Sequence, residues 1–170
     1  MLHELPDGTR VLIRPVEPGD KPRLAAAVAR LSAQSARLRF MAAKPSLSNA
    51  ELRYLTEIDG SDHIALVAVL ADDPDRVAGV ARCVRVAPGA DTAEFAIVVG
   101  DPLQGLGLGT VLTRALGEAA ARAGIRRFSA TTLAENVAVE RLIEHVAEHV
   151  ERRPGGGGVR ELLADLPGAA

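Results

Sequence analysis

An amphipathic helix between two strands is the feature that most constrains how this chain can fold. Apolar residues recur from Leu108 to Ala120 at the i, i+3, i+4 and i+7 spacing of one helical face, and Gly124 follows where a left-handed C-cap belongs. Residues 93–99 before this helix and residues 127–133 after it are predicted strands. A strand, a helix and a further strand predict a parallel pair that is joined by a right-handed crossover.

The segment before that helix predicts an antiparallel meander. Residues 64–70 form a continuous apolar run, which is typical of a strand buried on both faces. Strands are also predicted at 76–86 and 93–99, and the turns before them, at 72–75 and 88–91, are rich in Asp, Pro and Gly. Short turns of this kind join sequential strands as antiparallel neighbours.

The remaining predicted elements flank this centre. We expect a short strand at 10–14, a helix that Asp20 can cap, and a loop or broken helix at 32–45. A capping box between Ser48 and Glu51 begins another helix, and a short last helix contains Leu142. A terminal hairpin is expected from 148–152 and 159–165. The fold class is therefore α/β, a single domain over residues 1–170 whose mixed sheet combines the meander with the parallel crossover.

Composition excludes several classes of protein. The chain has 20 Lys and Arg against 22 Asp and Glu, a net charge of −2, which disfavours a protein that grips nucleic acid through a basic face. The single cysteine, Cys83, cannot close an intrachain disulfide, which suits a reducing compartment. The longest aliphatic run, 64–71, is too short to cross a membrane, and the first residues lack the pattern of a signal peptide. We therefore expect a cytoplasmic protein with neither a nucleic-acid nor a membrane partner, and the oligomeric state stays open.

A glycine-rich loop from Gln104 to Thr110 precedes the amphipathic helix. Glycines at every second position remove Cβ atoms, so that backbone N–H groups can converge on an anion beside the positive end of the helix dipole. The alternative is a tight strand-to-helix turn in which glycine only serves packing. A P-loop would need a lysine in the loop, and a dinucleotide-binding fold would need an acidic residue on the next strand; both are missing. The loop thus predicts a phosphate site of another kind.

In this glycine-rich loop the sequence resembles the GCN5-related N-acetyltransferases, the GNAT family. Their signature, a strand followed by Gln/Arg-x-x-Gly-x-Gly/Ala, is matched from Gln104 to Gly109. The resemblance covers nearly the whole chain and is strongest to the acetyltransferase domain of bacterial protein lysine acetyltransferases. It also includes segments at 7–9, 13–15, 55–59 and 93–96, and Leu31-Ser-x-x-Ser35 followed by Arg39-Phe40.

The resemblance implies acetyl-CoA as the acyl-donor substrate and no metal. It implies that the fourth predicted strand, 93–99, splays from the fifth, 127–133, with pantetheine in the gap. The residues expected to bind the cofactor through this gap and the loop are Ile97, Val98, Val99, Gln104, Gly105, Gly107, Gly109, Thr110 and Asn136. Asn136 is also a candidate helix N-cap, and the two roles are compatible.

Glu94 is the residue expected to act as general base. It shares a strand face with Ala96 and Val98, and we expect its carboxylate to be buried in apolar surroundings, which is costly unless the group is paired or used. An ion pair with Arg82 or Arg85 on the neighbouring strand is the structural alternative. In the similar lysine acetyltransferases a glutamate here takes the proton of the attacking amine, whose pKa of about 10.4 keeps it mostly charged.

The predicted function is thus the direct transfer of an acetyl group from acetyl-CoA to a primary amine, expected to be a protein lysine. A small-molecule amine or a protein N-terminus are alternative acceptors. A non-catalytic acyl-CoA-binding module is a further alternative, because the tyrosine that many GNAT members use as general acid has no counterpart after the last helix, and Tyr54 is the only tyrosine.

Three other features have both a functional and a purely structural explanation. His145-x-x-x-His149 matches an inverted zinc-protease pattern, but a third ligand is hard to place in the predicted hairpin, so we expect no metal site. Cys83, on a predicted strand, is expected to be inert. The basic residues Arg122, Arg126 and Arg127 either meet the 3′-phosphate of the cofactor or form a solvated surface.

Overall fold

The structure, a computed structural model, describes residues 1–44 and 46–168 and contains one eight-stranded sheet in the order β1-β2-β3-β4-β5-β6-β8-β7. The strands are β1 (Leu2–Glu4), β2 (Arg10–Pro15), β3 (His63–Leu70), β4 (Asp73–Arg85), β5 (Thr92–Val99), β6 (Arg127–Leu133), β7 (His149–Pro154) and β8 (Val159–Asp165). The helices are α1 (Lys21–Ala29), α2 (Ala33–Phe40), α3 (Asn49–Thr56), α4 (Leu108–Arg122) and α5 (Val137–Glu144).

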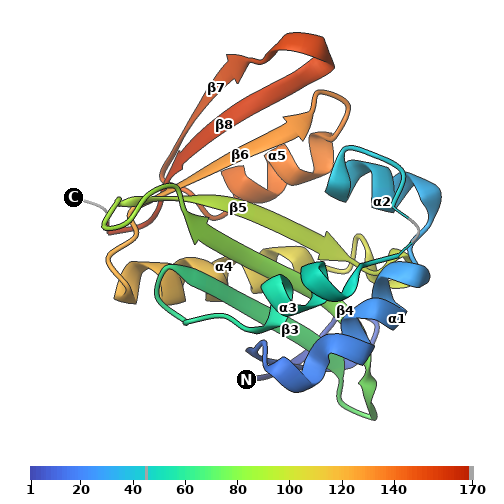
Figure 1. The fold of residues 1–170 in the computed structure, drawn as a ribbon. Helices are drawn as coiled ribbons and strands as arrows, with labels where there is room; N and C mark the ends of the chain where they lie inside the picture. Colours follow the sequence, from blue (N-terminus) through green and yellow to red (C-terminus); the bar gives the residue numbers. More distant parts are fainter. Residues whose placement is uncertain (45, 169–170) are drawn as a thin grey trace.

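The predicted meander and crossover are both present. Strands β2 to β5 pair antiparallel in sequence order, whereas β5 and β6 pair parallel across the connection through α4. Strand β3 is buried along nearly its whole length, as its continuous apolar run predicts. The C-terminal hairpin of β7 and β8 extends the sheet beyond β6 (Figure 1).

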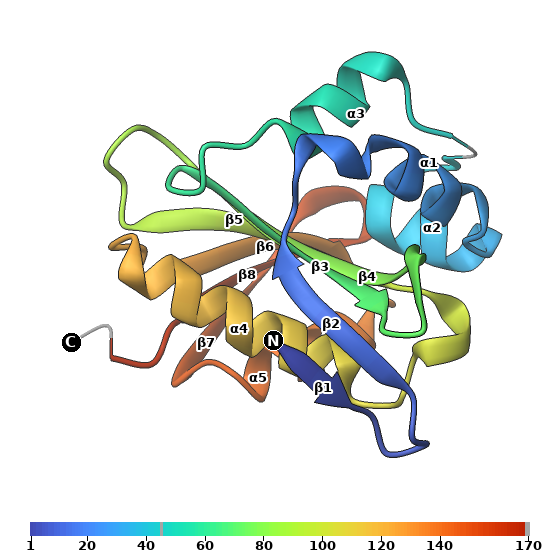
Figure 2. The same cartoon turned by 90° about the horizontal axis from the view of Figure 1, so that it is seen from below.

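Helices cover both faces of the sheet. Helix α4 lies under one face, and its buried residues Leu108, Leu112 and Leu116 join a core cluster that also includes Phe95 of β5 and Ile143 of α5. Helices α1 and α3 lie on the opposite face, where the second core cluster is formed (Figure 2). Few aromatic rings are available, so both clusters consist mainly of aliphatic side chains.

Helix boundaries follow the local sequence. The capping box between Ser48 and Glu51 is present at the start of α3, and Gly124, with φ +80°, follows the end of α4 as expected. Asp20 precedes α1 but does not cap it, which corrects our prediction. Its buried carboxylate instead binds the Arg14 guanidinium at 2.7 and 2.8 Å. Leaving a buried charge without an ion-pair partner costs more free energy than leaving a helix end without a side-chain cap.

Two elements differ from the sequence prediction. The segment 32–45, expected to be a loop or a broken helix, contains the regular helix α2, where the Ser32 side chain accepts a hydrogen bond from the Ser35 amide. Strand β1, three residues long, was not predicted, since so short an edge strand gains its order from pairing with β2. The two histidines of the zinc-protease pattern do not share a helix, because α5 ends before His145 and His149 begins β7.

Within residues 1–44 and 46–168 no helix is long and apolar enough to cross a membrane.

Candidate active site

The gap between β5 and β6 is the centre of the site. Their parallel ladder has three pairs and ends at Glu94 and Ser129, after which the strands separate toward α2 (Figure 1). The amide of Gly100 bonds to the carbonyl of Ala78 on β4. Because peptide groups alternate in direction along a strand, those of Ile97 and Val99 face the gap. They offer hydrogen bonds to a ligand that lies along β5.

The glycine loop brings backbone amides to the same gap. Gly105 and Gly107 have φ values of +76° and +83°, which residues with a side chain rarely adopt. No side chain caps α4, and its hydrogen bonding begins with the amide of Val111 on the carbonyl of Gly107. The amides of the first turn therefore lack helical partners and, with the helix dipole, favour an anion at this end.

Gly109 has a different role from that of the two loop glycines. A Cβ atom on Gly109 would lie 3.5 Å from the side chain of Leu142 in α5 and 3.8 Å from that of Val99. This glycine therefore allows α5 to lie close against the first turn of α4. Of the two explanations that the sequence left open for the glycines, packing therefore accounts for Gly109, and phosphate binding stays a prediction for the loop amides.

The predicted cofactor residues line one cavity of about 580 Å³, which we call the cofactor cavity after that prediction. All of the expected positions, Ile97, Val98, Val99, Gln104, Gly105, Gly107, Gly109, Thr110 and Asn136, belong to its wall. Asn136 also caps α5, where its side-chain oxygen accepts the Val139 amide at 3.4 Å. Arg141, which sequence reasoning did not single out, and His145, which it considered only as part of a metal pattern, also line the wall at the end of α5.

A polar hub fixes α2 beside this cavity. The Asp101 carboxylate accepts hydrogen bonds from the Ser32 hydroxyl at 2.6 Å, the Ser32 amide at 3.0 Å and the Ser35 hydroxyl at 2.8 Å. Burial alone would raise the pKa of Asp101, but these hydrogen bonds hold it below its ordinary value. The Gln104 side-chain amide donates to the Ser35 hydroxyl and the Val99 carbonyl, both at 3.0 Å. Gln104 thus joins the loop to α2 and β5.

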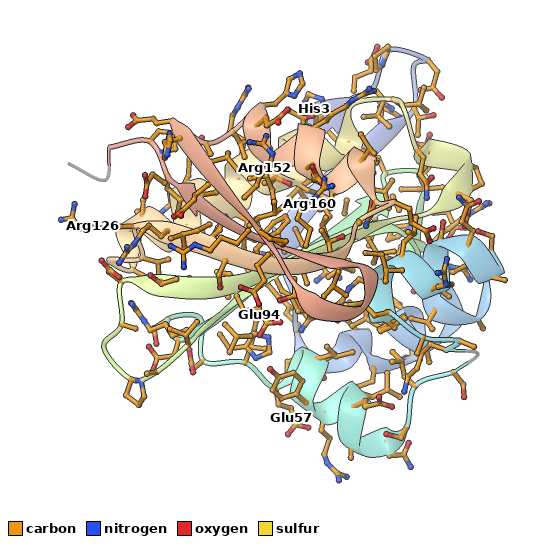
Figure 3. The ribbon with its side chains drawn as sticks, turned by 90° about the horizontal axis from the view of Figure 1, so that it is seen from above. His3, Glu57, Glu94, Arg126, Arg152 and Arg160 are labelled. Atoms are coloured by element: carbon orange, nitrogen blue, oxygen red, sulfur yellow. The ribbon has the colours of Figure 1, made fainter. Side chains whose placement is uncertain are left out.

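Glu94 lies at the start of the gap but differs from the prediction in its burial. Its carboxylate is exposed rather than buried, because the strands separate there and no layer covers this position. The ion pair with Arg82 or Arg85, which was the structural alternative, is not formed: Arg85 binds Asp62, and Arg82 binds the carbonyl of Leu55. Figure 3 shows the Glu94 side chain on the side of the sheet that carries α3. Glu94 acts electrostatically on the partly buried Arg39 of α2.

Glu94 does not line the cofactor cavity, whereas Arg39 lines both it and a second cavity of about 470 Å³. This second cavity lies between α1, α2 and strands β4 and β5, and Arg82 also lines it. Arg82, His63 and Tyr54 form a polar group on this face that the sequence did not assemble: Arg82 binds His63 at 3.0 Å, and the rings of Tyr54 and His63 have centroids 5.0 Å apart. The available signal was Arg82, a charged residue between the apolar neighbours Ala81 and Cys83 on β4.

Two other expectations concern residues away from the cavities. Cys83 is fully buried, and burial raises the pKa of its thiol to about 12, as expected for an inert side chain. The basic residues Arg122 and Arg127 lie at the far end of α4, about 20 Å from the loop at 1.5 Å per helical residue, and Arg127 pairs with Asp91. Of the explanations considered, a basic surface therefore fits and a 3′-phosphate contact does not. No cluster of three or more metal-ligating side chains occurs in the described part of the chain.

The model of the Acetyltransferase (GNAT) domain family matches residues 10–147, which is most of the chain. The chain belongs to the GNAT family. It is 35% identical to the Acetyltransferase Pat of Mycolicibacterium smegmatis over 141 residues, which cover 79% of this chain and 40% of that protein. It is 34% identical to an acetyltransferase of Pseudomonas aeruginosa over 142 residues, which cover 83% of this chain and 76% of that protein. The chain thus spans less than half of the first relative and about three quarters of the second.

Among solved structures, the GNAT domain of the S. lividans PAT protein superimposes on this chain with a TM-score of 0.86 at 27% identity, covering 98% of this chain and 96% of that one. The resemblance drawn from the glycine loop is therefore confirmed, and so is the fold that it implied: this chain is a GNAT acetyltransferase domain related to the Pat proteins.

Proposed function

We propose that this GNAT domain transfers an acetyl group from acetyl-CoA directly to the side-chain amine of a protein lysine. The single observation that carries the proposal is the cofactor cavity, whose wall joins the free amides of a helix N-terminus to the open edge of β5. A diphosphate suits the amides, and the amide groups of pantetheine suit the strand edge. The protein lysine as acceptor rests on the resemblance to bacterial lysine acetyltransferases.

Binding of the donor is divided among three sets of residues in this proposal. The backbone amides at Gly105, Gly107 and Thr110 hold the diphosphate. The peptide group of Ile97 and the N–H of Val99 hydrogen-bond pantetheine, since the Val99 carbonyl already accepts from Gln104. Val98, whose peptide faces β4, contributes only its side chain. Gln104 already donates both amide hydrogens within the protein, so it positions the loop and leaves its oxygen for the ligand.

Glu94 takes the proton in the proposed reaction. The amine attacks the thioester carbonyl at the start of the gap and loses its proton to the carboxylate, directly or through one water molecule. The C–N bond forms, the C–S bond breaks, and CoA leaves as a thiolate. Because the pKa of a thiol is near 8.5, this leaving group requires little assistance from a general acid. The exposed position of Glu94 is compatible with this role because a protein acceptor would itself cover the carboxylate.

The test is incubation of the protein with isotope-labelled acetyl-CoA and a whole-cell lysate, followed by mass-spectrometric localisation of the label. We expect label on lysine side chains of proteins. Label on small amines or on protein N-termini would replace the acceptor that we propose. A thermal shift with CoA but no transfer to any amine would instead identify a binding module.

We place the reaction in the cytoplasm, because the one buried thiol needs no oxidising compartment.

A further inference from the structure

Among residues 1–44 and 46–168, the buried Asp, Glu and Arg side chains have ion-pair partners, with one exception. Buried Asp20 pairs with Arg14 and Arg23, and buried Glu140 pairs with Arg160 and Arg152 from the terminal hairpin (Figure 3 labels both arginines). Arg82 is equally buried, with 6% of its surface exposed, but forms no ion pair within residues 1–44 and 46–168. Such a charge is costly to bury, so its surroundings indicate a missing anion.

Only one nitrogen of the Arg82 guanidinium is satisfied by the protein. Nη1 donates to the carbonyl of Leu55 at 3.2 Å and to Nε2 of His63 at 3.0 Å. No fully enclosed side-chain nitrogen or oxygen lacks a partner in the described residues, so the remaining N–H groups of Arg82 reach open space. That space is the cavity of about 470 Å³ between α1, α2 and the sheet. The guanidinium therefore presents free donors to a largely apolar chamber.

Arg39 adds a second cation at the same place. It lines the same cavity and forms no hydrogen bond or ion pair with any described residue. Burial and the neighbouring charge of Arg39 together lower the pKa of Arg82 to about 10, so Arg82 still carries its charge near neutral pH. Burial also lowers the pKa of Arg39, but a guanidinium stays protonated in proteins. His63 is neutral there, because burial and then the charge of Arg82 lower its pKa to about 4. Among the described residues, Glu94 is the one carboxylate whose charge raises the pKa of Arg39, which leaves the group with a positive excess.

We propose that Arg82 and Arg39 bind a carboxylate that is carried by one of the two reactants, so that the enzyme prefers a substrate with this group close to the reacting centre. The proposal rests on the proposed acetyl transfer and narrows its substrate class. Guanidinium groups are suited to it because they bind carboxylates through parallel N–H donors. Ala96 lies directly opposite Arg82, two residues beyond Glu94 on β5. By strand geometry the Cα atoms of Arg82 and Glu94 are about 8 Å apart.

Such a carboxylate has two chemical sources. It belongs to the acceptor, as the α-carboxylate of an amino acid or an acidic residue next to the modified lysine, or it terminates a dicarboxylic acyl group on CoA. The cavity supports both sources, because Arg39 and Val98 lie in its wall and in that of the cofactor cavity. A purely structural role, in which Arg82 only ties α3 to β3 and β4, would give no carboxylate preference.

The first experiment tests binding without turnover. The CoA-saturated protein, labelled with ¹⁵N-arginine, is titrated with glutarate, with glutaramide as the uncharged analogue and with sodium chloride as the control for ionic strength. We expect a saturable shift of the Arg82 Nε–H resonance with glutarate and none with glutaramide or chloride. Equal responses to all three, or none at all, would overturn the proposal. This outcome does not depend on whether acetyl transfer occurs, and it needs no variant.

The second experiment identifies the source of the carboxylate. Nα-acetyl-lysine is compared with its amide as acceptor, and succinyl-CoA is compared with butyryl-CoA as donor. We expect at least about a tenfold preference in kcat/KM for the carboxylate in one pair. That preference should be abolished in Arg82→Gln and partly kept in Arg82→Lys. Arg85→Gln is the control, since Arg85 lies on the same strand but pairs with Asp62. A preference that survives Arg82→Gln, or the absence of one in both pairs, would refute the assignment.

Discussion

Glu94 and Ser129 form the last pair of the ladder between β5 and β6. The strand pairs from β1 to β5 are all antiparallel. Those between β2 and β3, β3 and β4, and β4 and β5 extend over more residues than the parallel pair, and only the pair with the short strand β1 does not. The carboxylate that the sequence selects as a base therefore lies at the point where the sheet opens. The peptide groups of Ile97 and Val99, which face the gap, follow directly along the same strand; the Val99 carbonyl already accepts a hydrogen bond from Gln104. One local failure of pairing thus places the proposed proton acceptor beside the proposed acyl-donor site.

Glu94→Gln is expected to lower kcat by at least about tenfold, because the amide cannot take a proton from the amine. Affinity for acetyl-CoA, measured by calorimetry, should be almost unchanged, since Glu94 does not line the cofactor cavity. Glu57→Gln is the matched control: Glu57 is an exposed carboxylate on the same side of the molecule, paired with Lys21 (Figure 3). Wild-type turnover in Glu94→Gln would exclude Glu94 as the base.

Gly107→Ala is expected to weaken acetyl-CoA binding by about tenfold or more, because the loop must abandon its left-handed conformation and displace the amides. Gly8→Ala separates this effect from general strain. Gly8 has φ +85°, close to the +83° of Gly107, and a Cβ atom would meet nothing within 4 Å at either position. Both variants should lose about 1–2 kcal/mol of stability in urea unfolding. Equal CoA affinities in the two variants would contradict the phosphate cradle.

Asp101→Asn is expected to loosen α2 from the glycine loop. The carboxylate accepts three hydrogen bonds from Ser32 and Ser35, and the amide of asparagine cannot replace all of them. We expect a loss of about 1–3 kcal/mol in unfolding free energy and a weaker affinity for CoA, since α2 lines the cofactor cavity. Asp91→Asn, which removes an exposed ion pair with Arg127 far from the loop, should leave CoA affinity unchanged. Unaltered stability and affinity in Asp101→Asn would show that the hub is dispensable.

His63 should make stability fall in mild acid. Burial and then the charge of Arg82 lower its pKa from 6.5 to about 4, so the unfolded chain takes up the proton at a higher pH than the folded protein. The contribution of His63 to stability is therefore complete above pH 6.5 and declines as the pH falls toward 4, by up to about 3 kcal/mol at 1.4 kcal/mol per pKa unit. His63→Gln should show a smaller decline in urea unfolding between pH 7 and pH 4.5. An NMR titration that gave His63 a midpoint near 6.5 would contradict this assignment.

The sequence predicted most elements because their signals are local. The helical spacing from Leu108 to Ala120, the capping box at Ser48 and the apolar run of β3 each determine a conformation through neighbouring residues. The glycine loop was informative for the same reason, since left-handed backbone at Gly105 and Gly107 is a property of the residues themselves. These signals sufficed for the fold class, whereas the residues in the predicted wall of the cofactor cavity followed from the family resemblance. The extent of the single domain over residues 1–170 stays a prediction.

Side-chain environments were harder to predict, because they depend on which layer covers each strand. A single sequence records that Glu94 lies between apolar neighbours, but not that the adjacent strand departs there and leaves the carboxylate exposed. Helix α2 was predicted only as a loop or a broken helix, because its few apolar residues give no clear periodicity. Its position depends on Asp101, which is 66 residues away from Ser35 along the chain.

The amino-acid sequence by itself determined most of the strand and helix pattern, the glycine loop and the family, because each of these is written in short-range spacing and backbone preference. Only the tertiary structure decided which charges have partners. It brought Arg39 from α2 and Arg82 from β4 to one cavity and gave neither of them an ion pair with a described residue. Contacts between distant segments arise from packing of the whole chain, and no local pattern encodes them.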